Sequence, residues 1–211
     1  MRRILIFLAV GMLLASTWIA LMLGQIAPVQ RNIIYAHIPS SICALLCFVV
    51  VLVASIAYLR TAKSQWDIVA TAAAEVGTIL ATVLNLTGMI FSRAEWGVWW
   101  TPSPRLISAG LLWFLYVVYL ILRSSIRGPR YLQARVCAVF GIIAFLDVPM
   151  VFISARFIPD VHRANFSFDS GWQKLALFMG IGAMMILSAV FIWLKTDILK
   201  NQHKLEKESA I

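Results

Sequence analysis

Six long apolar runs constrain this chain more than any other feature of its sequence. Each is long enough, or nearly so, to cross a hydrocarbon core of roughly 30 Å as a helix. We place the runs at Ile4–Leu23, Ile38–Leu59, Ile68–Phe91, Leu106–Leu122, Val136–Ser154 and Leu175–Leu194. The expected fold class is therefore all-α, a polytopic integral membrane protein with six transmembrane helices.

The composition supports this class and argues against a soluble protein. Hydrophobic residues make up 62% of the 211 positions and charged residues only 13%, and the mean hydropathy is +0.89. A soluble domain is close to half apolar and a quarter charged. The net charge of +9 could indicate nucleic acid. However, the cations flank the apolar runs, which favours the lipid bilayer as partner and no nucleic acid.

The chain is expected to form one membrane domain over residues 1–194, followed by a charged cytoplasmic tail over residues 195–211. The first run follows Met1-Arg2-Arg3 and imitates a signal peptide. It continues to Leu23 without a convincing small-x-small cleavage site, so we interpret it as a retained helix. The connections between the runs are short and contain no soluble domain.

Lys and Arg in the connections predict the orientation. Twelve of them lie on the side that holds both termini: Arg2, Arg3, Arg60, Lys63, Arg123, Arg127, Arg130, Arg135, Lys195, Lys200, Lys204 and Lys207. Six lie on the other side: Arg31, Arg93, Arg105, Arg156, Arg163 and Lys174. Because positive charge favours the cytoplasm, both termini are expected inside (N-in/C-in).

An unusual aromatic stretch, EWGVWWTPSPRLIS, falls in the second external connection. It places three tryptophans within five positions and an arginine just beyond: Trp96, Trp99, Trp100 and Arg105. Gly97 and the two prolines predict that the stretch is not one regular helix. A single tryptophan at a membrane boundary usually belongs to the aromatic belt, but three in five residues exceed what anchoring requires.

Two histidines accompany this loop on the predicted external side. His37, in YAHIPSS, ends the first external connection, and His162, in FIPDVHRANF, lies in the third. Each could be a hydrogen-bonded interfacial group or a metal ligand, and spacing alone leaves both open. External arginines could pair with lipid headgroups or with an anionic ligand. Haem would use all of these features, since it combines a flat macrocycle, an iron that takes imidazoles and two propionates.

The sequence resembles the cytochrome c maturation protein C family (CcmC, haem exporter protein C). The resemblance covers most of the chain and rests on YAHIPSS, AEVG, LTG, EWGVWW, PRLIS and DVPMVFIS. The family loop reads approximately W-G-x-x-W-x-W-D-x-R-L-T. Trp96, Gly97, Trp100, Arg105 and Leu106 match it, and Trp99 matches a common extra tryptophan. Pro102, Ser103 and Ile107 stand where a tryptophan, the name-giving aspartate and a threonine are usual.

This resemblance implies a protein of the bacterial inner membrane that handles haem b for cytochrome c biogenesis. It implies His37 and His162 as axial ligands of the iron. Trp96, Gly97, Trp99, Trp100 and Arg105 would bind the cofactor at the periplasmic face. The haem would pass to a periplasmic haem chaperone, with help from the ABC-type transporter subunits of a maturation complex. We find no P-loop and no hydrolase spacing, so we expect a binding and delivery protein and not an enzyme.

Two alternatives stay open. Glu75 and Asp147 lie inside predicted spans, where a charge is costly, and a secondary transporter could use them as a proton relay. We favour hydrogen-bonded carboxyls packed between helices. A haem lyase-like cytochrome assembly factor is the closer alternative, since related families share the tryptophan loop. Three cysteines also fall within spans and are expected to be packing residues: Cys43, Cys47 and Cys137.

Overall fold

The computed structural model describes residues 2–26, 32–157 and 168–209 and consists of α-helices joined by short connections. The helices are α1 (Arg2–Met22), α2 (Ile34–Thr61), α3 (Ser64–Trp96), α4 (Pro104–Ser125), α5 (Arg130–Phe145), α6 (Asp147–Phe157) and α7 (Gly171–Ser209). Six segments of the described chain are long and apolar enough to cross a membrane, and the fifth combines α5 with the start of α6. The predicted all-α fold with six spans is confirmed.

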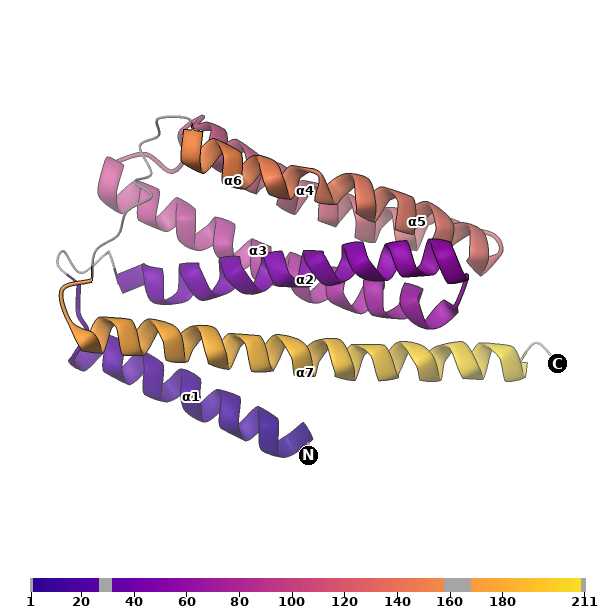
Figure 1. Cartoon of the computed structure of the whole chain (residues 1–211), viewed down its shortest axis with the longest axis horizontal. Helices are drawn as coiled ribbons and strands as arrows, with labels where there is room; N and C mark the ends of the chain where they lie inside the picture. Colours follow the sequence, from indigo (N-terminus) through magenta and orange to yellow (C-terminus); the bar gives the residue numbers. More distant parts are fainter. Residues whose placement is uncertain (1, 27–31, 158–167, 210–211) are drawn as a thin grey trace.

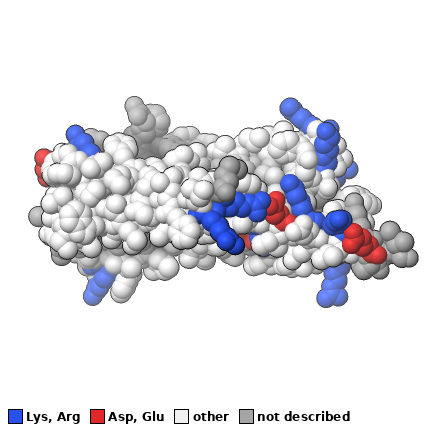
Figure 2. Space-filling model, turned by 90° about the horizontal axis from the view of Figure 1, so that it is seen from below, with Lys and Arg blue, Asp and Glu red and all other residues white. Residues whose placement is uncertain are grey.

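The six spans run along one common axis and alternate in direction, with α5 and α6 following one another in the fifth (Figure 1). The end of α1, the start of α2, the α3–α4 connection, the end of α6 and the start of α7 lie at one end, which we call the site end. The α2–α3 and α4–α5 connections lie at the other, which we call the basic end and toward which both chain termini point. On the face seen in Figure 2, a broad band carries no charged side chain, whereas charged residues of both signs gather toward the basic end. Placement of the basic end in the cytoplasm stays a prediction.

The closest helix packing in the core is between α2 and α3. A Cβ added to Gly77 of α3 would lie 2.7 Å from Phe48 Cε1 and 2.9 Å from Cys47 Cβ, so only glycine allows this approach. Phe48 stacks on Tyr116 of α4 with ring centroids 3.7 Å apart. The three cysteines are free and buried, as expected of packing residues.

The fifth span is not one continuous helix. Helix α5 ends at Phe145, and α6 begins at Asp147 after a turn at Leu146. Pro149 explains the break, because it has no N–H to donate to the carbonyl of Phe145 four residues earlier. The predicted fifth span is therefore confirmed as a membrane-crossing segment, but it consists of two helices joined at Leu146.

Several helices extend beyond the predicted apolar runs, and two of these extensions change how a predicted region is described. Helix α2 begins at Ile34, so His37 lies in its first turn and not at the end of a connection. Helix α7 continues through Lys195 to Ser209. Hydropathy ends a predicted span at the first polar residues, whereas a helix continues as long as its backbone hydrogen bonds do.

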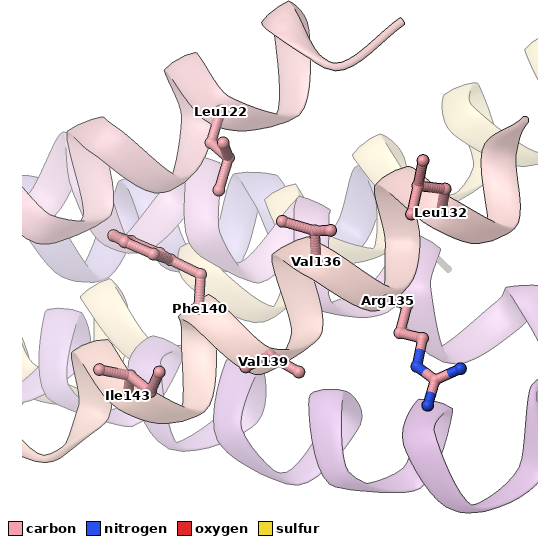
Figure 3. A pocket seen from close by; sticks show the side chains of 7 residues that line it. All are labelled: Leu122, Leu132, Arg135, Val136, Val139, Phe140 and Ile143. Atoms are coloured by element: carbon pink, nitrogen blue, oxygen red, sulfur yellow. The ribbon is translucent and has the colours of Figure 1, made fainter. Parts of the chain in front are cut away.

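An open apolar groove of about 390 Å³ lies between α4 and α5 (Figure 3). Its lining residues are Leu122, Leu132, Arg135, Val136, Val139, Phe140 and Ile143. Several of these side chains are exposed on the outer surface, as lipid-facing residues of a membrane protein are. Arg135 is the one charged residue in this lining.

Candidate functional site

The tryptophan loop begins with a sharp helix stop. Trp96 is the last residue of α3, and Gly97 follows with φ of +77°. The Gly97 N–H bonds back to the Arg93 carbonyl at 3.2 Å, which closes the helix in the left-handed conformation that glycine adopts without steric cost. The predicted interruption of the aromatic stretch is therefore confirmed, and Trp96 belongs to the helix while Trp99 and Trp100 follow the stop.

Side chains of α3 hold the start of this loop in place. The Ser92 hydroxyl donates to the Val98 carbonyl at 2.8 Å, and the Arg93 guanidinium donates to the Gly97 carbonyl. The Trp96 ring meets Phe91 edge to face, with centroids 5.6 Å apart. These contacts fix the backbone at the start of the loop to helix α3.

Beyond these contacts the loop exposes its aromatic surface. The exposed fractions of Trp99 and Trp100 are 56% and 50%. The groove between α4 and α5 and a second groove between α2 and α7 both lie away from this loop. Trp99 and Trp100 therefore expose apolar aromatic surface at the site end, which we call the platform, and such surface suits a large flat ligand.

Ser103 ends the loop as the N-cap of α4. Its hydroxyl accepts a long hydrogen bond, 3.4 Å, from the Leu106 N–H, and Pro104 occupies the first helical position. Aspartate and serine are both good N-caps. The departure from the family aspartate therefore keeps a cap and removes a charge beside Arg105, which lies half-buried in the first turn of α4.

His37 is held against α3 from the first turn of α2. Its Nδ1 lies 3.0 Å from the Thr87 hydroxyl oxygen. A Cβ added to Gly88 would lie 3.3 Å from His37 Cε1, so the imidazole rests directly on the α3 backbone. Thr87 and Gly88 belong to the LTG motif of the family resemblance, but nothing in the sequence predicted that Thr87 contacts His37.

The first turn of α2 is braced from the preceding connection. The Tyr35 hydroxyl donates to the Gly24 carbonyl at 2.6 Å. Asn32 bonds both to the N–H of Ile26 and to its carbonyl, at 3.0 and 3.3 Å. These neutral hydrogen bonds fix the backbone that carries His37.

His37 and the tryptophans of the loop lie at the same end of the bundle but at different depths along the helix axis. Thr87 and Gly88 precede Trp96 by eight to nine residues, which is about 12–14 Å along the axis of α3. His162 lies outside the described residues. The helices on either side of it, α6 and α7, respectively end and begin at the site end (Figure 1).

Glu75 and Asp147 have different partners and lie at different depths in the bundle. Glu75 forms an ion pair with Lys195 of α7, 2.7 Å apart, so it is a hydrogen-bonded carboxyl between helices, as expected. Asp147 starts α6, and its Oδ2 is buried with no hydrogen-bond partner among the described residues. Glu75 lies about three turns from the start of α3, whereas Asp147 lies nearly five turns from the start of α5. This separation does not favour a direct proton relay between them.

The fold and this end of it define a class: multi-pass helical membrane proteins with an outward tryptophan loop and a braced histidine. The family model described as "Heme exporter protein C" matches residues 1–209. The chain belongs to this family, which handles haem in cytochrome c maturation as a transport and delivery component.

Individual relatives are more distant. The heme exporter protein C of Rhodobacter capsulatus is 26% identical over 181 residues, covering 82% of this chain and 75% of the relative. That of Paracoccus denitrificans is 31% identical over 119 residues, covering 55% and 49%. A ccmC-like mitochondrial protein of Marchantia polymorpha is 23% identical over 195 residues, covering 90% and 82%. The chain thus spans about half to four-fifths of the length of these relatives.

Proposed function

We propose that this protein binds haem b at the site end, outside a bacterial inner membrane, and passes it to a periplasmic haem chaperone. The position of His37 carries the proposal. It is a half-buried imidazole, fixed by α3 and a braced helix turn, at the end of the bundle where Trp99 and Trp100 form an open platform. An imidazole and a broad aromatic surface are the two protein features that haem uses most directly.

The remaining residues complete a binding site in this proposal. His162 provides the second imidazole for the iron. Trp96, Gly97, Trp99 and Trp100 shape the surface for the macrocycle, and Arg105 pairs with a propionate. Haem itself supplies an iron that accepts nitrogen ligands. The chain has only to hold and release it, so its role is delivery and not catalysis.

Release fits the openness of the platform. Ligands that must be retained are usually largely buried in preformed cavities, whereas Trp99 and Trp100 remain half exposed. A chaperone approaching from outside the membrane could therefore reach a bound macrocycle directly. ABC-type subunits of a maturation complex are the partners that would drive this exchange.

Absorption spectroscopy of the purified protein tests this function. We expect a preparation with a haem Soret band in a six-coordinate low-spin form. His37→Ala and His162→Ala should each move the spectrum away from that form and release haem in detergent. His203→Ala is the matched control, because His203 lies beside Arg130 near the basic end, with a nitrogen–nitrogen distance of 2.5 Å. Wild-type haem content in both site variants would refute the proposal.

The haem lyase-like alternative has a separate outcome. A lyase would attach haem covalently to an added apocytochrome, whereas a delivery protein would yield only chaperone-bound haem. Incubation of the loaded protein with each acceptor, followed by denaturing gels stained for haem, separates the two functions. Covalent apocytochrome labelling without a chaperone would replace our proposal with the lyase.

A further inference from the structure

The Thr87 hydroxyl has three close polar neighbours, and together they determine its hydrogen-bond roles. Its oxygen lies 2.7 Å from the Val83 carbonyl, 3.0 Å from the Leu84 carbonyl and 3.0 Å from His37 Nδ1. A hydroxyl has one hydrogen to donate and two lone pairs with which to accept. Carbonyl oxygens can only accept, and the shortest of the three contacts is to the Val83 carbonyl, so we assign the single hydrogen of Thr87 to the backbone.

The consequence falls on the imidazole. Since the Thr87 hydrogen is committed to its own helix, the contact with His37 requires Nδ1 to carry a proton and donate it. In a neutral imidazole only one ring nitrogen is protonated. Nε2 is then the nitrogen with the lone pair, which is the state in which an imidazole can ligate iron.

Gly88 adds a steric constraint to this hydrogen bond. With the Cβ of any larger residue only 3.3 Å from Cε1, the ring would have to shift away from α3. Thr87 therefore sets the rotation and protonation of the ring, and Gly88 sets its distance from the helix. We call these two residues the Thr87–Gly88 cradle.

We propose that Thr87 is a positioning residue for haem: it holds His37 in the Nδ1-protonated tautomer and the ligating orientation before haem arrives. This inference rests on the proposed function of the site. Ligating histidines commonly donate their other ring N–H to a fixed acceptor, which orients the ring and raises the basicity of the ligating nitrogen. Here the acceptor comes from a helix fifty residues away in sequence.

The first test needs no haem. Histidine side-chain nitrogens of the ¹⁵N-labelled haem-free protein in nanodiscs report the tautomer directly by NMR. We expect His37 to be Nδ1-protonated in the wild type at a pH where the ring is neutral. Thr87→Val should shift the population toward the Nε2-protonated form, and Thr87→Ser should restore the wild-type spectrum. A wild-type His37 protonated on Nε2 would overturn the inference whatever the haem data show.

The second test measures haem affinity by titration with added haemin. Loss of such an orienting partner typically weakens metal binding about 10–100-fold, which we expect for Thr87→Val, with Thr87→Ser close to the wild type. Thr82→Val is the matched control. Its hydroxyl also donates within α3, to Thr78, and accepts from a side chain of another helix, Trp113, but it does not touch His37.

The two proposals fail differently in these experiments. If His37→Ala leaves haem binding unchanged, the ligand assignment and the proposed function are wrong. If His37→Ala abolishes binding while Thr87→Val binds haem like the wild type, only the positioning role is wrong. Equal weakening by Thr82→Val and Thr87→Val would show a general effect of α3 packing and would also refute it.

Discussion

The two ends of the same helix bundle are stabilised by different interactions. At the basic end, Arg123 pairs with Asp67 through two bonds of 2.7 Å. About three turns from the start of α3, Lys195 of α7 pairs with Glu75 at 2.7 Å. At the site end, the described loop and helix-start contacts that we identify around Trp96 and His37 are hydrogen bonds to backbone carbonyls or neutral hydroxyls. A surface built this way is fixed in shape while Trp99 and Trp100 stay exposed.

Charge pairing also extends along α7 and α1. Arg2 at the start of α1 bonds to Asp197 of α7, and its guanidinium lies 4.2 Å from the ring centre of Trp193. The site end instead connects the same two helices through Gln173, which donates to the Gln25 carbonyl at 3.2 Å. The difference suggests that the basic end fixes helix register, so that the site end can remain open to ligand.

The largest expected effect is at the basic end. Arg123→Ala leaves the Asp67 carboxylate, whose side chain is only 14% exposed, without its bidentate partner. Breaking a buried pair costs about 3–5 kcal/mol because one charge remains desolvated. We therefore expect a large drop in the thermal unfolding midpoint in detergent.

Haem binding should nevertheless survive in the folded fraction of this variant. Arg123 lies nineteen residues from the start of α4, about 29 Å from the tryptophan loop. Lys204→Ala is the control, since its pair with Glu208 is exposed and should contribute little. An Arg123→Ala protein that is stable but has lost haem would contradict the assignment of stability to the basic end and haem binding to the site end.

The second-largest effect is expected at the tryptophan loop, where haem affinity should fall while the protein stays folded. Replacing Trp96, Trp99 and Trp100 by alanine should lower haem affinity by roughly 1–3 kcal/mol per ring, by analogy with bases stacked on aromatic side chains. Haemin titration measures this loss. The unfolding midpoint should change little for Trp99 and Trp100, which are half exposed, and more for Trp96, which packs on Phe91.

Trp172 supplies the control for that comparison. It is equally exposed, at 50%, but it lies at the start of α7 and outside the loop. Trp172→Ala should retain haem if the loop itself is the platform. If Trp172→Ala lost as much haem as the loop variants, Trp99 and Trp100 would instead belong to a general aromatic belt.

The sequence predicted the spans well because apolar run length is a local property. It also predicted that the aromatic stretch is not one regular helix, from Gly97 and the two prolines, although the position of the stop after Trp96 comes from the structure. The contacts that define the site were not predictable in this way. His37 and Thr87 are fifty residues apart, and Lys195 meets Glu75 across the bundle. Such pairs arise from the packing of α2, α3 and α7 and leave no periodic signal in any one helix.

The smallest effect concerns the cap at Ser103. Its bond from the Leu106 N–H is long, at 3.4 Å, so Ser103→Ala should cost about 0.5 kcal/mol, the low end of the range for N-caps. Ser103→Asp should cost nothing, because aspartate caps as well and its charge is favourable at a helix N-terminus. The unfolding midpoints of the two variants measure the difference.

Ser124→Ala is the matched control at the other end of α4, where the hydroxyl only bonds back to the Ile121 carbonyl of its own helix. It should be neutral, because that bond caps no free N–H. If Ser103→Ala and Ser103→Asp were equally destabilising, the hydroxyl would matter for its small size in a buried position and not as a cap. In that case the exchange of the family aspartate for serine would be a change of volume at the site end, and Arg105 would have to be positioned by contacts other than the first turn of α4.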